Sequence, residues 1–349
     1  MSKKVLIGMS GGVDSSVAAA LLQQQGYDVT GVTFLLHADA SSAPSQDAAR
    51  VASALGIRHE TVDFTTLFRS EIMDYFVSEY QSGRTPNPCI ACNRKIKFGR
   101  FLELADEWGA DFIATGHYAR ISLDSQSGAY CLYASEARGK DQSYFLYTMT
   151  QRELARTLMP LSGMDKDKTR ALARSLGLPV AEKPDSQDVC FIPDGDYIRF
   201  LEEYAGYQGQ KGPFRSIDGE ILGWHKGIAH YTIGQRKGLG TAFGKPMFVT
   251  GLDASTNTVY LGEKGTEYRQ EFTASDLCLT GNEALDTSRP LTCKIRYAAP
   301  LAPCTATLLG GGKLCVRMEQ PARAVTPGQS VVFYDGNRVL GGAVIDDMY

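Results

Sequence analysis

The amino-acid sequence predicts a doubly wound α/β domain built on a parallel sheet, followed by a small Gly-rich β-containing domain and a C-terminal β-barrel. The first observation is that short apolar runs alternate with helix-like segments up to about residue 115. The second is a rise in glycine, with 12 glycines in residues 206–262 against 36 in the whole chain of 349. After about residue 270 only strand-like runs and turns follow. We therefore expect domains at 1–204, 205–268 and 269–349.

The first domain begins with an apolar run at residues 5–9, which suits a buried parallel strand. Residues 14–25 have helical composition, and Gly26 closes that helix. The same alternation predicts strands at 27–36, 59–64 and 111–115, and helices at 46–55 and 96–108. Repeated β–α units of this kind favour a doubly wound parallel sheet.

The C-terminal part of the chain shows only strand and turn patterns. The run Asp335-Gly336-Asn337 between two apolar segments is typical of a hairpin turn. We expect strands at 291–297, 305–309, 313–318, 330–334 and 339–345. Short strands at this spacing predict a small closed β-barrel.

The overall composition and charge exclude several classes of protein. Apolar residues make up 43% and charged residues 21% of the chain, which is typical of a folded domain and not of a disordered one. A formal net charge of −3 excludes a globally basic nucleic-acid coat protein, although it leaves room for a local basic face. No run approaches the roughly 18 apolar residues that cross a membrane. We therefore expect no membrane partner and a cytoplasmic location.

A glycine-rich loop separates the first predicted strand from the first predicted helix. It reads Ser10-Gly11-Gly12-Val13-Asp14-Ser15. Glycines let backbone N–H groups approach phosphate oxygens, and the helix N-terminus adds partial positive charge. The loop is not a Walker A motif, because no Gly-Lys-Ser/Thr follows it. The alternative to a phosphate-binding loop is an ordinary glycine turn in which Asp14 or Ser15 caps the helix.

The eight cysteines are too sparse for a disulfide scaffold. Cys89 and Cys92 form a Cys-x-x-Cys motif, which can be a redox pair, half of a metal site or a coincidence. Cys190 follows a polar segment and precedes Phe191. We expect the remaining five to be buried and inert, namely Cys131, Cys278, Cys293, Cys304 and Cys315.

Longer motifs carry a family resemblance. The glycine-rich loop resembles the PP-loop of the N-type ATP pyrophosphatases, whose fold is of the adenine nucleotide hydrolase type. Four further segments resemble the tRNA-specific 2-thiouridylase family: TPNPCIACNRKIKFGRFLELADEWGADFIATGHYARI, GKDQSYFLY, DSQDVCFIPDGDYIRFLEEY and HYTIGQRKGLG. The resemblance runs from the first strand through Gln329, so it covers nearly the whole chain.

The resemblance implies an ATP-dependent tRNA-uridine 2-sulfurtransferase. Such an enzyme adenylates the 2-carbonyl of the wobble uridine (position 34) and then transfers sulfur to give 2-thiouridine, AMP and pyrophosphate. It implies ATP and Mg²⁺, tRNAs for Lys, Glu and Gln, and a sulfur donor protein or cysteine desulfurase. A uridine has to leave its stack for this chemistry.

Roles for individual residues follow from the same resemblance. Cys190 would carry sulfur as a persulfide, and Cys92 would assist its release by forming a disulfide. The ATP contacts would be Gly8, Met9, Ser10, Gly11, Gly12, Val13, Asp14, Ser15, Phe34 and Gly116, with Asp14 as a Mg²⁺ ligand and Phe34 beside the adenine. The flipped base would meet Asn87, Pro88, Cys89 and His117, and further tRNA contacts would be Lys140, Asp141, Gln142, Arg296, Tyr297 and Gln329.

Some alternatives stay open at this point. Cys89, Cys92 and Cys190 could instead hold three corners of a 4Fe–4S cluster whose fourth iron binds hydrosulfide. Asp188 is either an acid/base group, a metal ligand or a loop-turn residue. The RNA surface would use basic clusters at Arg94, Lys95, Lys97 and Arg100, at Arg236-Lys237 and at His225-Lys226. The rival functions are another PP-loop ligase, such as argininosuccinate synthase, and a non-catalytic tRNA-binding module or iron–sulfur protein.

Overall fold

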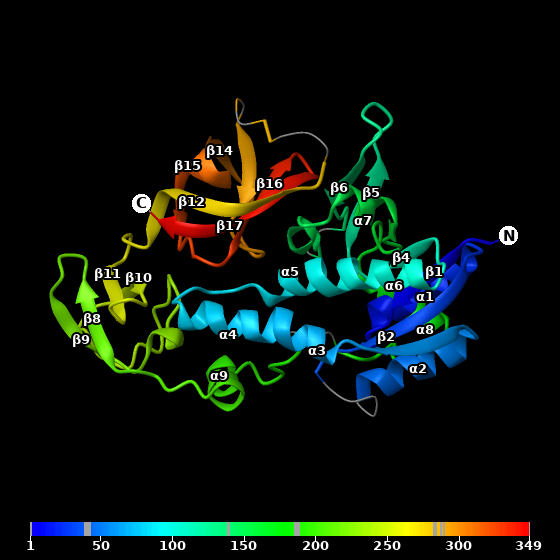
Figure 1. Ribbon diagram of the computed structural model, residues 1–349, viewed down its shortest axis with the longest axis horizontal. Helices are drawn as coiled ribbons and strands as arrows, with labels where there is room; N and C mark the ends of the chain where they lie inside the picture. Colours follow the sequence, from blue (N-terminus) through cyan, green and yellow to red (C-terminus); the bar gives the residue numbers. More distant parts are fainter. Residues whose placement is uncertain are drawn as a thin grey trace.

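The computed structural model describes residues 2–37, 43–137, 140–184, 189–281, 285–286, 288 and 290–348. The chain forms an N-terminal α/β domain, a small central sheet and a C-terminal barrel, which confirms the predicted fold class (Figure 1). None of the helices in these ranges is long and apolar enough to cross a membrane.

A five-stranded parallel sheet forms the centre of the first domain, in the order β3-β2-β1-β4-β7. Its strands are β1 (Lys4–Gly8), β2 (Asp28–Leu35), β3 (Arg58–Asp63), β4 (Phe112–Ala114) and β7 (Thr157–Leu158). Both faces are covered, since Val5 and Ile7 of β1 belong to one apolar cluster and Leu6 to the other. This explains why the strands are apolar without alternation.

Helices cover the two faces of this sheet. One face packs against α1 (Val13–Gln24), α2 (Ala43–Leu55) and α8 (Lys166–Ser175). The other carries α3 (Thr65–Phe68), η1 (Arg69–Met73), α4 (Asp74–Gln81), α5 (Pro88–Cys92), η2 (Asn93–Arg100) and α6 (Phe101–Glu107). The chain leaves β1 toward one neighbour and returns through β4 on the other side, so the ligand crevice of a doubly wound sheet lies where these two strands end.

The helix that we expected at 96–108 begins eight residues earlier, at Pro88. Asn87 caps it by accepting a hydrogen bond from the Ile90 N–H, and Pro88 occupies the first turn, where its missing N–H costs nothing. The Cys-x-x-Cys motif is therefore helical. The middle of this run, η2, is a π-helix, a form that is frequent at functional sites.

The central domain is a four-stranded sheet in the order β10-β11-β8-β9. Its core includes Phe214, Val249 and Val259. The strands are β8 (Gly212–Ser216), β9 (Ile221–His225), β10 (Met247–Asp253) and β11 (Thr258–Glu263), and the 3₁₀ turn η4 (Ile228–His230) follows β9. Helix α9 (Tyr197–Ala205) leads into this domain.

The C-terminal domain is a closed barrel of six strands. Closure follows because β12 (Tyr268–Leu279) pairs with β15 (Lys313–Arg323) on one side and with β17 (Arg338–Met348) on the other. The remaining strands are β13 (Leu291–Lys294), β14 (Ala302–Leu309) and β16 (Ser330–Asp335), and η5 (Gly310–Gly312) joins β14 to β15. The hairpin predicted at residues 335–337 connects β16 and β17.

One hairpin of the first domain joins this barrel. Strands β5 (Ala119–Leu123) and β6 (Tyr130–Ala134) pair with each other, and Leu132 of β6 pairs with Val339 of β17 (Figure 1). Two short elements follow the hairpin, η3 (Ser143–Leu146) and α7 (Gln151–Ala155). This hairpin thus extends the barrel sheet and is separate from the five-stranded parallel sheet.

Three of the five cysteines that we expected to be buried and inert are buried: Cys131, Cys293 and Cys304. Cys278 and Cys315 keep part of their surface exposed, which corrects that expectation. Cys278 follows a register irregularity in β12, and the thiol of Cys315 faces the carboxylate of Glu271 at 3.3 Å. An irregular or outward-facing strand position exposes a side chain that apolar sequence context alone assigns to the core.

Candidate phosphate loop and thiol site

The glycine-rich loop connects the end of β1 to the start of α1. Gly12 is the N-cap of α1 in an extended conformation, and its carbonyl oxygen accepts hydrogen bonds from the hydroxyls of Ser15 (3.3 Å) and Ser16 (2.7 Å). The N–H of Ser10 donates to the Ser15 hydroxyl at 3.3 Å. Asp14 and Ser15 lie inside the first turn of α1, because Gly12 is its N-cap, so neither of them is the N-cap residue.

Two glycines allow the backbone to pack closely around this loop. Gly11 has a φ of +68°, and a Cβ at this position would lie 2.2 Å from the carbonyl oxygen of Pro44. A Cβ on Gly116, which follows β4, would lie 2.7 Å from the backbone nitrogen of Ser15. Gly116 thus approaches the N-terminus of α1 at a point where no side chain fits.

The carboxylate of Asp14 is held by two side chains from outside the loop. The Lys166 ammonium donates to both of its oxygens at 2.7 and 2.8 Å, and the Tyr118 hydroxyl donates to Oδ1 at 2.7 Å. Lys166 begins helix α8, whose N-cap is Asp165. The negative charge that the loop brings to the crevice is therefore already matched by a lysine.

An aromatic group stands at the end of β2, next to the loop. The Phe34 ring packs edge-on against Phe101, with centroids 4.8 Å apart, and lies 5.4 Å from the ring of Phe64. A Cβ on Gly8 would come within 3.5 Å of the Phe34 ring. The ring keeps part of its surface exposed beside the loop, so it can present an apolar wall to a planar ligand.

The strand that precedes the loop is also fixed by side chains. The Thr33 hydroxyl donates to the Met9 carbonyl at 3.0 Å and lies 2.8 Å from Nε2 of His59. Because that hydroxyl has one proton and the carbonyl can only accept, Nε2 of His59 has to be the donor to Thr33. This chain of bonds sets the point at which the backbone leaves β1.

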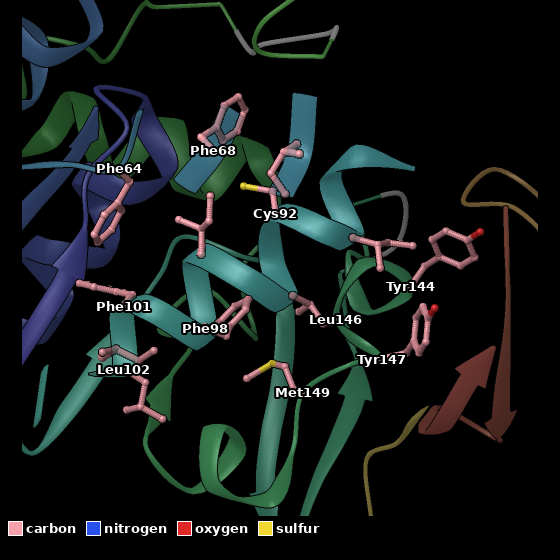
Figure 2. Close-up of a cluster of buried hydrophobic side chains, with 14 of the residues drawn as sticks. Phe64, Phe68, Cys92, Phe98, Phe101, Leu102, Tyr144, Leu146, Tyr147 and Met149 are labelled. Atoms are coloured by element: carbon pink, nitrogen blue, oxygen red, sulfur yellow. The ribbon is translucent and has the colours of Figure 1, made fainter. Parts of the chain in front are cut away.

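Cys92 lies in the apolar interior at the end of α5, among aromatic side chains that include Phe68 and Phe98 (Figure 2). Its burial raises the pKa of the thiol to about 12, against an opposing effect of the Lys97 charge. Cys89 lies one turn earlier and is exposed. In this conformation Cys92 is therefore a protonated thiol and not a nucleophile.

Cys190 is exposed and electrostatically linked to the other two thiols. The surrounding protein raises the pKa of Cys190 by desolvation, while the Lys97 charge lowers it and Cys89 raises it. Both Cys190 and Cys89 also raise the pKa of Cys92. The structure thus brings the three predicted site cysteines into one neighbourhood. Asp188, like the rest of residues 185–188, lies outside the described residues.

The three thiols do not form a metal site as they stand. Among the described residues, which include Cys89, Cys92 and Cys190, no three Cys, His, Asp or Glu side chains gather closely enough to hold an ion. The donor set suits iron or another soft metal chemically.

His117 lies beside the same helix. Its ring centroid is 5.7 Å from that of Phe98, and its Nδ1 lies 2.9 Å from the Thr115 hydroxyl. Desolvation, and to a smaller extent the Lys97 charge, lowers the pKa of His117 to about 3. His117 is therefore neutral at physiological pH and can donate or accept a hydrogen bond without adding charge.

The predicted tRNA contacts near His117 form an ordered turn. Gln142 exchanges hydrogen bonds with the backbone of Tyr118, at 3.0 Å through its side chain and 2.9 Å through its N–H. The carboxylate of Asp141 accepts from the backbone of Ser135 and from Ser143. Lys140 precedes this turn and has partners of its own. This turn is therefore held next to His117, which precedes Tyr118.

The predicted contacts on the barrel have different environments. The Arg296 guanidinium donates through one nitrogen to the Ala324 carbonyl and, at 3.2 Å, to the Thr326 hydroxyl, whereas its buried Nε has no hydrogen-bond partner among the described residues. Tyr297 is 39% exposed, and its ring lies 4.6 Å from that of Phe145. Tyr297 is thus the member of this pair that faces solvent.

The basic cluster after the Cys-x-x-Cys motif is mostly engaged in ion pairs. Arg94 contacts Asp276 at 2.6 Å, Lys95 contacts Glu71 at 3.2 Å, and Arg100 contacts Glu107 at 2.6 Å. His225 is buried and bonds to the backbone of Asn257. Lys97 has no ion pair in the described part of the chain, and its charge acts on Cys92, Cys190 and His117. Sequence reasoning placed Lys97 in an RNA surface and did not connect it to the thiols.

Other side chains of the site were not predicted. Lys166, Tyr118, Thr33 and His59 were missed, as was Lys183, whose ammonium donates to the Gly11 carbonyl at 2.9 Å. Lysines in exposed-looking segments give no sequence signal of a distant partner. The only hint is that Lys183 lies two residues before the motif containing Cys190.

Comparisons with known proteins match the whole chain. Residues 3–194 match the family described as "tRNA methyl transferase HUP domain", 198–263 the "tRNA methyl transferase PRC-barrel domain" and 269–345 the "Aminomethyltransferase beta-barrel domain".

Curated relatives named tRNA-specific 2-thiouridylase MnmA are similar over nearly their full length. The chain is 45% identical to that of Clostridioides difficile, with 99% of both chains covered. It is 48% identical to that of Acetivibrio thermocellus (98% and 99% covered) and 47% identical to that of Pelobacter propionicus (98% and 97% covered). The HUP domain implies that the protein uses ATP. Because these identities extend over nearly the full length of both chains, the chain belongs to the tRNA-specific 2-thiouridylase family.

Proposed function

We propose that this chain is a tRNA-uridine 2-sulfurtransferase that converts the wobble uridine of tRNA to 2-thiouridine at the expense of ATP. The observation that carries the proposal is the combination, in one member of this family, of a phosphate loop at the crevice of the sheet with Cys92 and Cys190 in one neighbourhood. A PP-loop ligase such as argininosuccinate synthase would need the loop but not the pair of thiols.

The first step is adenylation of the uridine. The 2-carbonyl oxygen attacks the α-phosphorus of ATP, the bond to the β-phosphate oxygen breaks, and pyrophosphate leaves with the electron pair. Residues 10–15 bind the phosphates through backbone N–H groups and the N-terminus of α1, and Phe34 lies beside the adenine.

Mg²⁺ fits this site in the manner usual for nucleotide enzymes, through one carboxylate and the phosphates. Asp14 is the carboxylate that would hold it, once Lys166 gives up one of its two bonds to that side chain. Bound there, the ion would neutralise charge on the phosphates.

The second step transfers sulfur. A Cys190 persulfide presents its terminal sulfur to C2 of the adenylated uridine, and AMP leaves with the C–O bond electrons. The Cys92 thiolate then attacks the inner sulfur of Cys190. The sulfur–sulfur bond breaks with its electron pair on the sulfur bound to C2, which gives 2-thiouridine, and a Cys92–Cys190 disulfide forms. A cellular dithiol has to reduce this disulfide for the next turnover. Because the pKa of Cys92 is about 12 in the tRNA-free structure, we expect tRNA binding to change its surroundings.

A second route to 2-thiouridine would use an iron–sulfur cluster. One observation supports it, namely the exposed thiol of Cys89 one turn before Cys92. Three thiolates could hold a 4Fe–4S cluster in place of the persulfide. The two routes give the same product and differ in whether thiolation requires iron.

The proposal includes partners and location. We propose that the tRNA substrates are those for Lys, Glu and Gln and that the sulfur comes from a donor protein or a cysteine desulfurase, as the family resemblance implies. Asn87, Pro88, Cys89 and His117 would line the flipped base, while the 140–142 turn, Tyr297 and Gln329 would contact the tRNA outside it. A cytoplasmic location goes with these substrates.

The test combines two readouts on the same reaction. Wild-type protein with ATP, Mg²⁺, tRNA and a persulfide donor should release pyrophosphate only when tRNA is present, and should form 2-thiouridine. Cys92→Ala and Cys190→Ala should keep tRNA-dependent pyrophosphate release but lose 2-thiouridine. Absence of tRNA-dependent pyrophosphate release from the wild type would overturn the proposal. Thiolation only by iron-loaded, anaerobically purified protein would replace the persulfide route by the cluster route.

A further inference from the structure

Lys183 contacts the phosphate loop from a distant part of the sequence. Its ammonium donates to the carbonyl oxygen of Gly11 at 2.9 Å and to the carboxylate of Asp47 at 2.6 Å. Asp47 belongs to α2, and its side chain is only 12% exposed. Among the described residues, no other Lys or Arg side chain donates to the backbone of the loop segment 9–12. A full positive charge thus stands against the turn that would cradle phosphate.

The present partners of Lys183 leave it free to exchange. Asp47 is paired with Arg50 as well as with Lys183, and both cations lower the pKa of its carboxyl. If Lys183 moved away, Arg50 would still neutralise this nearly buried carboxylate. The other partner, the Gly11 carbonyl, is uncharged and binds an ammonium less strongly than a phosphate does. A polyphosphate in the loop would therefore compete successfully for the ammonium.

We propose that Lys183 is a phosphate ligand of ATP, and that its movement onto the bound nucleotide couples ATP binding to the position of Cys190. The proposal deepens the proposed function and rests on it, since it concerns the same nucleotide site. It assigns a role in binding and positioning to a residue that the resemblance did not include.

The chemistry of the first step requires such a charge. As the bond between the uridine oxygen and the α-phosphorus forms, the bond to the β-phosphate oxygen breaks and its electron pair leaves with pyrophosphate. The loop itself supplies backbone N–H groups and the partial charge of one helix end, and the Lys166 charge is matched by Asp14. An ammonium placed on the leaving phosphates stabilises the charge that develops there.

The coupling follows from the position of Lys183 in the chain. It lies seven residues before Cys190, after helix α8 and before the motif that carries the thiol. If the shift of the Lys183 ammonium from Gly11 to a phosphate draws the backbone at residue 183 toward the crevice, it also displaces the chain that leads to Cys190. The proposal therefore includes a change in the exposure of Cys190 when the nucleotide site fills.

The primary test measures ATP affinity by calorimetry, with a non-hydrolysable ATP analogue and Mg²⁺. Lys183→Met should weaken analogue binding about 10- to 100-fold, as expected for a lost charge-assisted bond to phosphate, and should lower kcat/KM for ATP at least as much. Lys183→Arg should restore part of both. Arg50→Met is the matched control, because it removes the other cation on Asp47 without touching the loop, and it should bind the analogue like wild type.

A double variant separates a phosphate ligand from a merely structural contact. If Lys183 only neutralises Asp47, then Asp47→Asn combined with Lys183→Met should recover wild-type affinity, and that result would overturn the proposal. If Lys183 is a phosphate ligand, the double variant should still bind the ATP analogue weakly.

The coupling has its own readout, the rate at which iodoacetamide modifies Cys190, followed by peptide mass spectrometry. The ATP analogue should change this rate several-fold in wild type and leave it unchanged in Lys183→Met. If the analogue changed the rate of Cys190 modification equally in wild type and Lys183→Met, the proposed coupling would be contradicted. Failure of the proposed function is distinguishable, since it would show as wild-type protein that binds the analogue through Lys183 but releases no pyrophosphate with tRNA.

Discussion

The side-chain amide of Gln329 donates hydrogen bonds to the carbonyl oxygens of Thr85 (2.9 Å) and Pro86 (3.3 Å). The Thr85 N–H in turn donates to the Pro327 carbonyl at 2.9 Å. The barrel loop is thereby fixed to the segment that enters the helix of Cys89 and Cys92. A residue expected to contact tRNA therefore also connects two domains next to the thiols.

This connection predicts a stability effect for Gln329→Leu. Loss of two hydrogen bonds, with the carbonyl oxygens left poorly paired, should lower the free energy of unfolding by about 1–2 kcal/mol. Urea unfolding followed by circular dichroism measures it. Gln126→Leu, in an exposed turn, is the control and should change little. An unchanged stability combined with weaker tRNA binding would instead assign Gln329 to the RNA surface alone.

The close approach of Gly116 to α1 predicts loss of nucleotide binding in Gly116→Ala. The added methyl group would lie 2.7 Å from the Ser15 nitrogen, so the loop has to shift. We expect ATP affinity to fall at least about 10-fold, measured by calorimetry. Gly163→Ala is the control, because a Cβ at that position would meet nothing within 4 Å. If Gly116→Ala bound ATP with wild-type affinity, the prediction would be contradicted, because the loop backbone could then shift without loss of binding.

The desolvation of the partly buried His117 predicts a pH dependence of stability. Its pKa is lowered to about 3, whereas the unfolded chain binds a proton near the ordinary value of 6.5. Between these values the unfolded state holds more protons, so the contribution of His117 is complete above about pH 6.5 and declines as the pH falls toward 3.

The corresponding variant is His117→Asn, which keeps a polar group near Thr115 but does not titrate. The loss of unfolding free energy between pH 7 and pH 4, measured by urea unfolding, should be smaller in His117→Asn than in wild type. The other histidines are present in both proteins and cancel in the comparison. An equal slope in both proteins would mean that His117 titrates normally in the folded state.

The charge of Lys97 predicts an effect on the thiols. It opposes desolvation at both Cys92 and Cys190, so Lys97→Met should raise the pKa of each further. Alkylation of Cys190 by iodoacetamide at pH 8 should become slower, because the thiolate is the reacting form. Lys95→Met, which removes a lysine paired with Glu71, should leave the rate unchanged. An unchanged rate in Lys97→Met would contradict this effect.

The sequence predicted those strands, helices and turns that depend on a local pattern of residues. The strand at 5–9 and the helix that follows Gly12 are encoded by an apolar run and a glycine turn, and the structure confirms both. The start of the helix at Pro88 was missed because its apolar periodicity begins later, although Asn87 and Pro88 are a capping signal that could have been used. The barrel hairpin at 335–337 was predicted from its turn residues.

Long-range pairings could not be predicted in this way. Leu132 and Val339 pair across more than half of the chain, and neither strand contains a sign of its partner. The same is true of the Lys183 contact to Gly11 and of the Lys166 contact to Asp14. Local periodicity reports which face of an element is buried, whereas these contacts depend on how finished elements pack.

The most direct test of the central claim is nucleoside analysis of position 34 after a single turnover of wild-type protein with ATP, Mg²⁺, tRNA and a persulfide donor. The account predicts 2-thiouridine in an amount equal to the pyrophosphate released, and none when Cys190 is replaced by alanine. Unmodified uridine in wild type, or 2-thiouridine formed equally well by the Cys190→Ala protein, would contradict it.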